Sequence, residues 1–516
     1  MKTFFRSSAL FAFVFSFSAV LADVKLPALL NNNMVLQQQT SVNFWGWADP
    51  GEKVSILASW NKKALETVAD KNGDWKVTLH TPKAGGPFTI VVQGKNKIEL
   101  SNVMTGEVWV CGGQSNMHYP MAPLDKTWSL GVLNYEKEIA EANYPKIRLF
   151  TVERKTSETP FKDVVGKWDE CNPGTIRDFT AVGYFFGREL FRNMDIPIGL
   201  ISSNWGGTPA ESWTRKDILE KDTLFRPILE RYKKALEDYP QARKEYAEAL
   251  KKWKEDVASG MITGEKAKQA PRAPLGPGSN KAPYVLYNAM IAPIVNFTIK
   301  GVIWYQGENN ADRAWQYRKL FPTMIANWRN DWREGNFPFY FVQIAPHRSQ
   351  NPEIREAQLM TFRSVPNTGM AVITDHGDST NIHPLNKQVV GYRLSLWALA
   401  KDYGKSNLVY SGPLYKSFKK EGNKIRVYFD FVGSGLVCQG DSLTHFTIAG
   451  ADQKFVKAIA KIDGNSVLVW NSDVSDPVAV RFAWENIPMP NFFNKEGLPA
   501  SPFRTDDWPG KTFGKK

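Results

Sequence analysis

Three observations predict an α/β protein whose parallel sheet is flanked by two β-rich modules. Between residues 106 and 404, strand-like apolar runs alternate with helical patterns, and such alternation builds a parallel sheet covered on both faces. Residues 23–105 and 405–516 instead show short alternating runs separated by turn residues, which is typical of antiparallel β-structure. The length of 516 residues is sufficient for two or three domains. We therefore expect three units with these bounds.

The first 22 residues have the pattern of a secretory signal peptide. Lys2 and Arg6 accompany an apolar stretch, and Val20 and Ala22 occupy the positions that a signal peptidase reads. We expect the mature chain to begin near Asp23 and the protein to be exported to the periplasm or the extracellular space. No later apolar segment is long enough to cross a bilayer, so we expect no membrane span in the mature chain.

Five apolar runs are the predicted strands of the central region. They are "EVWVC" at 107–111, "IPIGLISS" at 196–203, "IKGVIWYQ" at 299–306, "FPFYFVQIA" at 337–345 and "MAVITD" at 370–375. Gly112 and Gly113 are expected to end the first of them in a tight turn. Residues from about 215 to 283 form a helical insertion that ends in a Pro/Gly-rich linker, and we expect this insertion to rim the functional site.

Charge and composition exclude several classes of function. The chain carries 65 Lys and Arg against 52 Asp and Glu, for a formal net charge of +13, but the basic residues are scattered, so nucleic acid is not an expected partner. No His/Cys cluster has metal-ligand spacing, and we expect neither a metal nor another cofactor. Cys111, Cys171 and Cys438 allow at most one disulfide and leave its existence open. The sequence does not indicate an oligomeric state.

Polar, glycine-containing loops follow four of the predicted strands. They are "GGQSNM" around Ser115, "SSNWGGTPAESW" at 202–213, "WYQGENNAD" at 304–312 and "TDHGDSTNIHP" at 374–384. The carboxyl ends of parallel strands share one edge of a sheet, where a nucleophile, a base and oxyanion donors from separate loops can meet. Ser115 is either that nucleophile or the cap of the next helix, and its own stretch does not distinguish the two.

The four loops together resemble those of the SGNH hydrolases, and among them the sialate O-acetylesterase type of carbohydrate esterase. The marks are "GQSNM", "GGTPAESW", "YQGENN" and "NIHP..K..VGYRLSLWAL", which extend from residue 106 to about 400. The resemblance implies a flavodoxin-like three-layer domain flanked by sandwich-like or jelly-roll-like β modules. It also implies a serine esterase that removes O-acetyl groups from carbohydrate, with 9-O-acetylated sialic acid as the first choice of substrate.

The resemblance also implies roles for individual residues. Ser115 is the nucleophile, and His383 is the base that takes its proton. The expected oxyanion and substrate-binding residues come from three loops: Gln114, Asn116, Gly206, Gly207, Gln306 and Asn309. Among them the oxyanion donors are a glycine N–H of Gly206 or Gly207 and a side-chain amide of Gln306 or Asn309, beside the N–H of Ser115.

The chain departs from the superfamily at the acid of the triad. An Asp usually stands three residues before the histidine, but this position is Thr380. The orienting carboxylate must therefore come from elsewhere. Asp378 is the first choice, Glu308 the second, and Asp375 the third because it could equally cap its loop.

Other functions remain open at this point. Acetylesterases of plant xylan or xyloglucan share the "GQSN" and "QGE" marks. A glycan-binding protein would explain the 18 tryptophans but not a serine and a histidine at strand ends. A glycosidase would need paired carboxylates such as Glu308 and Asp378, and would leave Ser115 idle. An ordinary α/β-hydrolase is disfavoured because Met117 stands where its nucleophile elbow requires glycine.

Overall fold

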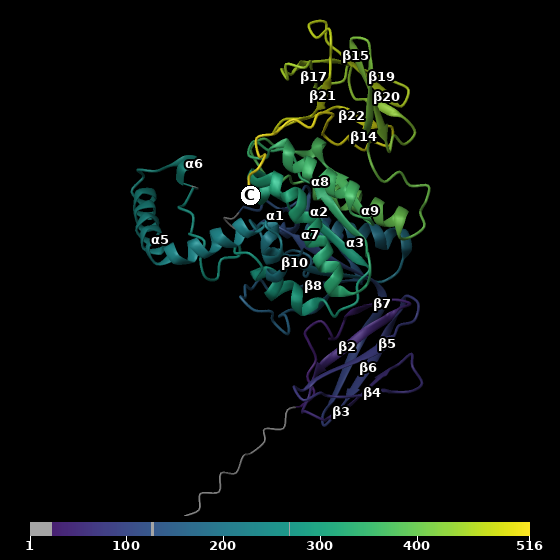
Figure 1. Ribbon diagram of the computed structural model, residues 1–516. Coiled ribbons are helices and arrows are strands. Elements are labelled where there is room, and N and C mark those ends of the chain that lie inside the picture. Colours follow the sequence, from purple (N-terminus) through teal and green to yellow (C-terminus); the bar gives the residue numbers. More distant parts are fainter. Residues whose placement is uncertain (1–22, 125–127, 268) are drawn as a thin grey trace, which may run out of the picture.

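A largely parallel sheet forms the centre of the protein in the computed structural model, which describes residues 23–124, 128–267 and 269–516 (Figure 1). Its strands lie in the order β13-β12-β11-β7-β10-β8-β9, and β9 alone among them is antiparallel to its neighbour. The strands are β7 (Lys97–Gly113), β8 (Tyr144–Thr151), β9 (Trp168–Cys171), β10 (Ile198–Asn204), β11 (Gly301–Tyr305), β12 (Phe339–Gln343) and β13 (Thr368–Val372). The predicted α/β class is confirmed. All five expected strands are present, and β8 and β9 add to them.

Helices cover both faces of this sheet. Helices α3 (Ala181–Met194) and α9 (Lys387–Lys401) pack on one face, and α7 (Ala314–Trp332) and α8 (Pro352–Ser364) pack on the other. On the first face the ring centroid of Trp109 lies 5.0 Å from that of Phe186 in α3. On the second face the ring centroid of Trp304 lies 5.5 Å from that of Trp328 in α7. Burial on both faces explains why the strands read as continuous apolar runs.

The N-terminal β module is joined to the central sheet by one long strand. Strand β7 pairs with β6 over its first half and with β10 and β11 over its second half, so it runs without a break across position 105. A second sheet, formed by β2 and β5, completes the module. The strands are β1 (Val35–Gln37), β2 (Ser41–Trp47), β3 (Lys53–Ala58), β4 (Leu65–Val68), β5 (Asp74–His80) and β6 (Gly85–Gln93).

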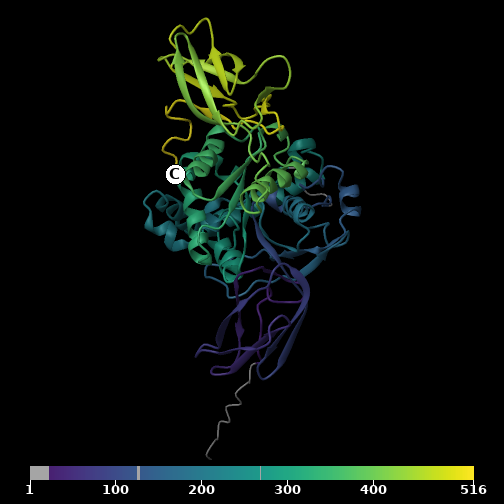
Figure 2. The same ribbon diagram turned by 90° about the vertical axis from the view of Figure 1, so that its right-hand side faces the viewer.

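The C-terminal β module has its own hydrophobic core and lies at the opposite end of the central unit (Figure 2). One sheet contains β14 (Leu414–Glu421), β15 (Lys424–Asp430), β20 (Ser466–Trp470) and β19 (Ile459–Asp463). A second contains β18 (Val456–Lys457), β17 (Phe446–Ala449), β21 (Ala479–Phe482) and β23 (Phe503–Arg504), and β16 (Leu436–Cys438) pairs with β22 (Phe492–Asn494). Phe446, Phe482 and Phe503 are among the buried side chains of its core.

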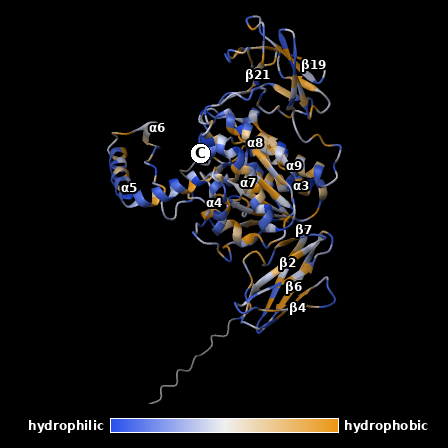
Figure 3. Ribbon diagram, viewed as in Figure 1, coloured by the Kyte–Doolittle hydropathy of each residue, from blue (hydrophilic) through white to orange (hydrophobic). Residues whose placement is uncertain are grey.

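The helical insertion projects from the central unit. It consists of α4 (Lys216–Lys221), α5 (Arg226–Ala258) and α6 (Gly264–Ala267), and α5 extends away from the sheet (Figure 1). Its residues are mainly hydrophilic, whereas those in the strands of the sheet are mainly hydrophobic (Figure 3). Only Ile228 and Tyr232 are buried along α5. The packing of this helix against the body is therefore limited to its first two turns.

Two sequence expectations concern the chain as a whole. Cys111, Cys171 and Cys438 are all free thiols, so no disulfide links the modules. In the described ranges no helix combines the length and apolar character needed to cross a membrane. The predicted signal peptide, residues 1–22, lies outside the described residues.

Candidate active site

The strand order brings the four predicted loops to one cavity. Strand β7 lies between β10 and β11, so the loops that follow these three neighbouring strands meet at the carboxyl edge of the sheet. The fourth loop leaves β13 at the sheet edge and returns toward β7 before α9 begins. Ser115, Gly206, Asn309 and His383 together line a cavity of about 780 Å³. The loops that the sequence singled out therefore form a single site.

Ser115 is presented by a strand end that requires glycine. Gly113, the last residue of β7, has a φ of +139°, and a Cβ atom there would lie 2.2 Å from the carbonyl oxygen of Tyr305. The N–H of Gln114 donates to that same oxygen at 2.9 Å. The expected turn at Gly112 and Gly113 is wrong, because both glycines remain in the strand and the chain bends at Gln114. Ser115 begins the short helix α1 (Ser115–His118), which has no side-chain cap at its start.

The glycine loop lies directly against the nucleophile. A Cβ atom on Gly206 would be 3.4 Å from the Cβ of Ser115. The N–H of Trp205 donates to the carbonyl oxygen of Gly113 at 3.1 Å, which ties this loop to the end of β7. Gly207 follows with a φ of +71° and also lines the cavity. The backbone of Gly206 therefore lies directly beside Ser115.

The third loop contributes Asn309 but not Gln306. Asn309 lines the cavity, and its backbone N–H donates to Oε1 of Gln114 at 3.3 Å. Gln306 is fully buried, and its Nε2 donates to Oδ1 of Asn310 at 2.6 Å and to the carbonyl oxygen of Thr208 at 3.3 Å. The expectation that Gln306 could supply an oxyanion donor is corrected, because its amide hydrogens are used to join two loops beneath the cavity.

An aromatic side chain lies between two histidines at the cavity. The ring centroid of Trp128 is 4.8 Å from that of His383 and 5.3 Å from that of His118. Burial, with the nearby charges of Lys387 and His347, lowers the pKa of His383 to about 3. Burial also lowers the pKa of His118 to about 3. Both imidazoles are therefore neutral at neutral pH, although in the described part of the chain neither hydrogen-bonds to Ser115.

The carboxylates expected to orient His383 are engaged elsewhere. Oδ1 of Asp378 accepts hydrogen bonds from the N–H of Thr380 at 2.7 Å, its hydroxyl at 2.8 Å and the N–H of Asn381 at 3.0 Å. Asp375 accepts two hydrogen bonds from Arg393, at 2.6 and 2.7 Å. Over the described ranges, neither carboxylate forms a hydrogen bond or ion pair with His383. Asp378 shapes the turn before the histidine, which is a different role from the expected one.

Glu308 belongs to a buried polar network with Asn116 and Lys387. Nδ2 of Asn116 donates to Oε1 of Glu308 at 2.7 Å and to the carbonyl oxygen of Ile382 at 3.1 Å. Nζ of Lys387 donates to Oδ1 of Asn116 at 2.7 Å and to the carbonyl oxygen of Pro384 at 2.6 Å. Oε2 of Glu308 is buried without a hydrogen-bond partner. Burial raises the pKa of Glu308 and lowers that of Lys387 to about 7, and each group's charge opposes the other's shift.

Several residues of the site had no assigned role in the sequence analysis. Trp128, Arg272, Lys281 and Gln350 line the cavity, and Lys387 lies beneath it. The position of Lys387 in the sequence could have indicated a functional role. It stands four residues after His383 at the first position of a helix, where the helix dipole disfavours a cation. Arg272 and Lys281 lie in the insertion that was expected to rim the site, whereas Trp128 and Gln350 follow no pattern that sequence spacing reveals.

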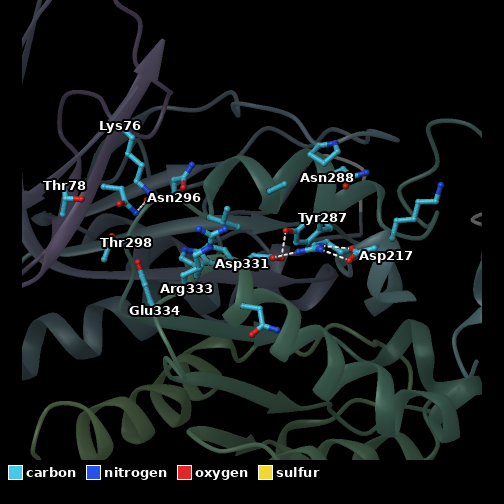
Figure 4. A pocket seen from close by; sticks show the side chains of 18 of the residues that line it. Lys76, Thr78, Asp217, Tyr287, Asn288, Asn296, Thr298, Asp331, Arg333 and Glu334 are labelled. Carbon is cyan, nitrogen blue, oxygen red and sulfur yellow. Dashed lines mark hydrogen bonds and ion pairs between the residues drawn. The ribbon is translucent and has the colours of Figure 1, made fainter. Parts of the chain in front are cut away.

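A larger cavity lies elsewhere, between the N-terminal module and the end of α7 (Figure 4). It measures about 920 Å³ and, among the described residues, shares no lining side chain with the cavity at Ser115. Asp331 lines this cavity and accepts hydrogen bonds from Arg215 at 2.5 Å and Tyr287 at 2.6 Å. Arg215 also forms an ion pair with Asp217. Its polar groups largely satisfy one another, so we do not place the reaction here. No group of three or more His, Cys, Asp or Glu within the described ranges is arranged to hold a metal.

Comparisons with known proteins relate the chain to carbohydrate esterases. The family described as "Carbohydrate esterase, sialic acid-specific acetylesterase" matches residues 105–250 and 276–390. The chain is 31% identical to the sialate O-acetylesterase of Rattus norvegicus over 93% of this chain and 94% of that protein. It is 29% identical to the sialate O-acetylesterase of Homo sapiens over 94% of both chains. The crystal structure of a carbohydrate acetylesterase from Xanthomonas citri superimposes with a TM-score of 0.78 and 35% identity, covering 94% of this chain and 100% of that one.

Proposed function

Because the chain belongs to the sialic acid-specific acetylesterase family of carbohydrate esterases, we propose that it is a serine esterase that removes O-acetyl groups from sialic acids. The proposal includes the flavodoxin-like, three-layer SGNH architecture for residues 106–404, supported by helices on both faces of the parallel sheet. It also includes sandwich-like or jelly-roll-like folds for residues 23–105 and 405–516, each of which contains more than one sheet.

The proposed reaction is acyl transfer to Ser115 followed by hydrolysis. Oγ of Ser115 attacks the acetyl carbonyl while His383 takes the hydroxyl proton. The oxyanion is bound by the N–H of Ser115, an N–H of the Gly206 loop and the side-chain amide of Asn309, each worth about 3 kcal/mol in the transition state. His383 then protonates the departing sugar oxygen, so the C–O bond of the ester breaks. In the second half, His383 deprotonates water, which attacks the acetyl carbon; the bond from this carbon to Oγ of Ser115 breaks, His383 returns the proton to Oγ, and acetate is released.

The observation that carries this proposal is the placement of Ser115 and His383 in one cavity, with the backbone of Gly206 packed against the serine. A neutral His383 is in the protonation state of a general base. Hydrogen bonds of a catalytic pair are often formed only in the complex with substrate. A glycosidase has no comparable support, because Glu308 is bonded to Asn116 and Asp378 is bonded within its own turn.

The preference for a sialic acid rests on the charges around the cavity. Arg272 and Lys281 line it, and Cε of Lys281 lies 3.8 Å from the position that a Cβ on Gly207 would occupy. Asp312, which pairs with Arg313, also lines the cavity, and the excess of cations over this exposed carboxylate favours a substrate with a carboxylate. Trp128 is 37% exposed and offers an aromatic face to a sugar ring. A plant-polysaccharide acetylesterase, the alternative, would not need the two cations.

Acetate release from O-acetylated sialic acid, acetylated xylan and acetylated xyloglucan tests the proposal at equal ester concentration and at two ionic strengths. We expect sialic acid to be the preferred substrate, with a kcat/KM that falls as salt is added. Preference for a neutral polysaccharide, independent of salt, would overturn the substrate and leave the esterase mechanism standing. Loss of all three activities in Ser115→Ala is the control for the mechanism.

Export is part of the proposal. Residues 1–22 have the charge, apolar stretch and small residues of a secretory signal. Expression of the full chain in a secreting host, followed by N-terminal sequencing, is expected to give a mature protein that begins near Asp23. A mature protein that retains residues 1–22 would contradict it.

A further inference from the structure

One buried lysine lies where the nucleophile loop and the histidine loop meet. Lys387 is 1% exposed and is the first residue of α9. Its ammonium nitrogen lies 4.6 Å from the ring centroid of Tyr119 and 5.9 Å from that of Tyr305. Together with the two hydrogen bonds that it donates, these aromatic faces replace the water that an exposed lysine would have.

Lys387 occupies an unfavourable position. Removing an ammonium group from water carries a large desolvation cost even after relaxation. The amino end of a helix adds to this cost, because the helix dipole repels a cation there. A hydrophobic residue would fill the same space without either cost. A contribution of Lys387 to activity explains why a cation stands at this position.

The contacts of Lys387 lead to both neighbours of His383. Its Nζ donates directly to the carbonyl oxygen of Pro384, which follows the histidine. It also donates to Oδ1 of Asn116, whose Nδ2 donates to the carbonyl oxygen of Ile382, which precedes the histidine. The chain is therefore held on each side of His383 by one ammonium group, directly on one side and through one amide on the other.

The same amide fixes the nucleophile. Asn116 follows Ser115 in sequence and is fully buried. Lys387 at its oxygen and Glu308 at its nitrogen allow one orientation of the amide, because a cation cannot bond to the NH2 group and a carboxylate cannot bond to the oxygen. The residue after the serine and the two residues around the histidine are thus bonded to one another.

We propose that Lys387, acting through Asn116 and the carbonyl oxygens of Ile382 and Pro384, is the positioning residue that holds His383 against Ser115. It supplies the orientation that a carboxylate on the imidazole supplies in a Ser-His-Asp triad. Glu308 is the counter-charge of Lys387 in this arrangement. The inference rests on the proposed roles of Ser115 and His383.

Lys387→Met tests the proposal, because methionine keeps most of the volume and removes the charge and both hydrogen bonds. We expect kcat for 4-nitrophenyl acetate to fall about 100-fold, the loss that a small misplacement of a reacting group causes, with KM little changed. The acid limb of kcat/KM is expected to move to higher pH, because the positive charge of Lys387 helps to keep the pKa of His383 low. Lys300→Met is the matched control, since Lys300 lies beside Asp402, is partly buried and is remote from the cavity.

Two further variants keep the test decisive. Asn116→Ala removes the link to Ile382 but leaves the bond from Lys387 to Pro384, and is expected to lower kcat even if Lys387→Met does not fold. In a His383→Ala background, Lys387→Met is expected to cause no further loss, because its effect acts through the histidine. Folded variants with wild-type kcat and pH profile, or an equal loss of kcat without His383, would overturn the proposal. Activity of Ser115→Ala and His383→Ala would instead overturn the function on which it rests.

Discussion

Replacement of Asp378 by Asn separates a residue that shapes a turn from one that orients the imidazole. The three hydrogen bonds to this carboxylate all end on Oδ1, and an Asn oxygen in the same place keeps two lone pairs to accept hydrogen bonds from these donors. Asp378 is exposed, so each bond is at the low end of the usual net contribution, about 0.5 kcal/mol, and loss of the charge weakens rather than removes it. The expected cost to the turn is therefore below about 1 kcal/mol in total.

The expected kinetic effect is correspondingly small. A cost of about 1 kcal/mol lowers the equilibrium constant for forming the turn at Asp378 by at most about fivefold. We therefore expect kcat of Asp378→Asn to fall by no more than about fivefold. Asp378→Ala removes all three bonds and is expected to reduce kcat further, because Asn381 then no longer holds the N–H of His383 as firmly. Initial rates with 4-nitrophenyl acetate, with thermal unfolding as the control for folding, measure both. A fall of about 10⁴-fold in folded Asp378→Asn would refute this reasoning and make Asp378 the triad acid.

Three further predictions follow from the site. His383→Ala should lower kcat by about three orders of magnitude or more. His376→Ala should retain most of the wild-type kcat, because His376 lies beside Asp375 and not at the cavity, and similar losses in the two variants would contradict the assignment of His383 as the base. The kcat/KM of the wild type should stay level below pH 6.5, because the pKa of His383 is lowered and the base stays deprotonated; an acid limb at or above pH 6.5 would contradict it. Gly113→Ala should lower the free energy of unfolding by more than about 1 kcal/mol in a denaturant titration, since its Cβ would overlap Tyr305; wild-type stability would contradict the strand geometry.

The sequence predicted the parallel sheet because buried strands read as uninterrupted apolar runs, and it missed β8 because Arg148 interrupts its run. Arg148 is 3% exposed, and its guanidinium donates to the carbonyl oxygens of Pro145 and Asn33 and to the side chain of Asn102. Asn33 and Asn102 belong to the N-terminal module, and Pro145 lies in β8 itself. The local sequence does not predict such contacts, so a charged residue within an apolar run is interpreted as the end of a strand.

The candidate site was predictable to the level of its loops. Glycines and amides at strand ends indicated which loops carry the site, since the parallel sheet brings those ends together. The hydrogen bonds between residues of the site were not predictable. Asn116 and Lys387 are 271 positions apart in the sequence, and they are bonded because the fold places the start of α9 next to α1. The expected triad geometry around Asp378 failed to appear because its side chain finds three donors in its own turn, which is the local alternative open to any Asp.

Mass spectrometry of the protein after inhibition by diethyl 4-nitrophenyl phosphate tests the central assignment most directly. Attack by Oγ of Ser115 on phosphorus forms an O–P bond and expels 4-nitrophenolate, which leaves a diethylphosphoryl group that the enzyme releases slowly. We predict one such group per chain, on the peptide that contains Ser115, in proportion to the loss of acetylesterase activity, and none in His383→Ala under the same conditions. Modification of a different residue, or full inhibition with Ser115 unmodified, would contradict the assignment of Ser115 as the nucleophile.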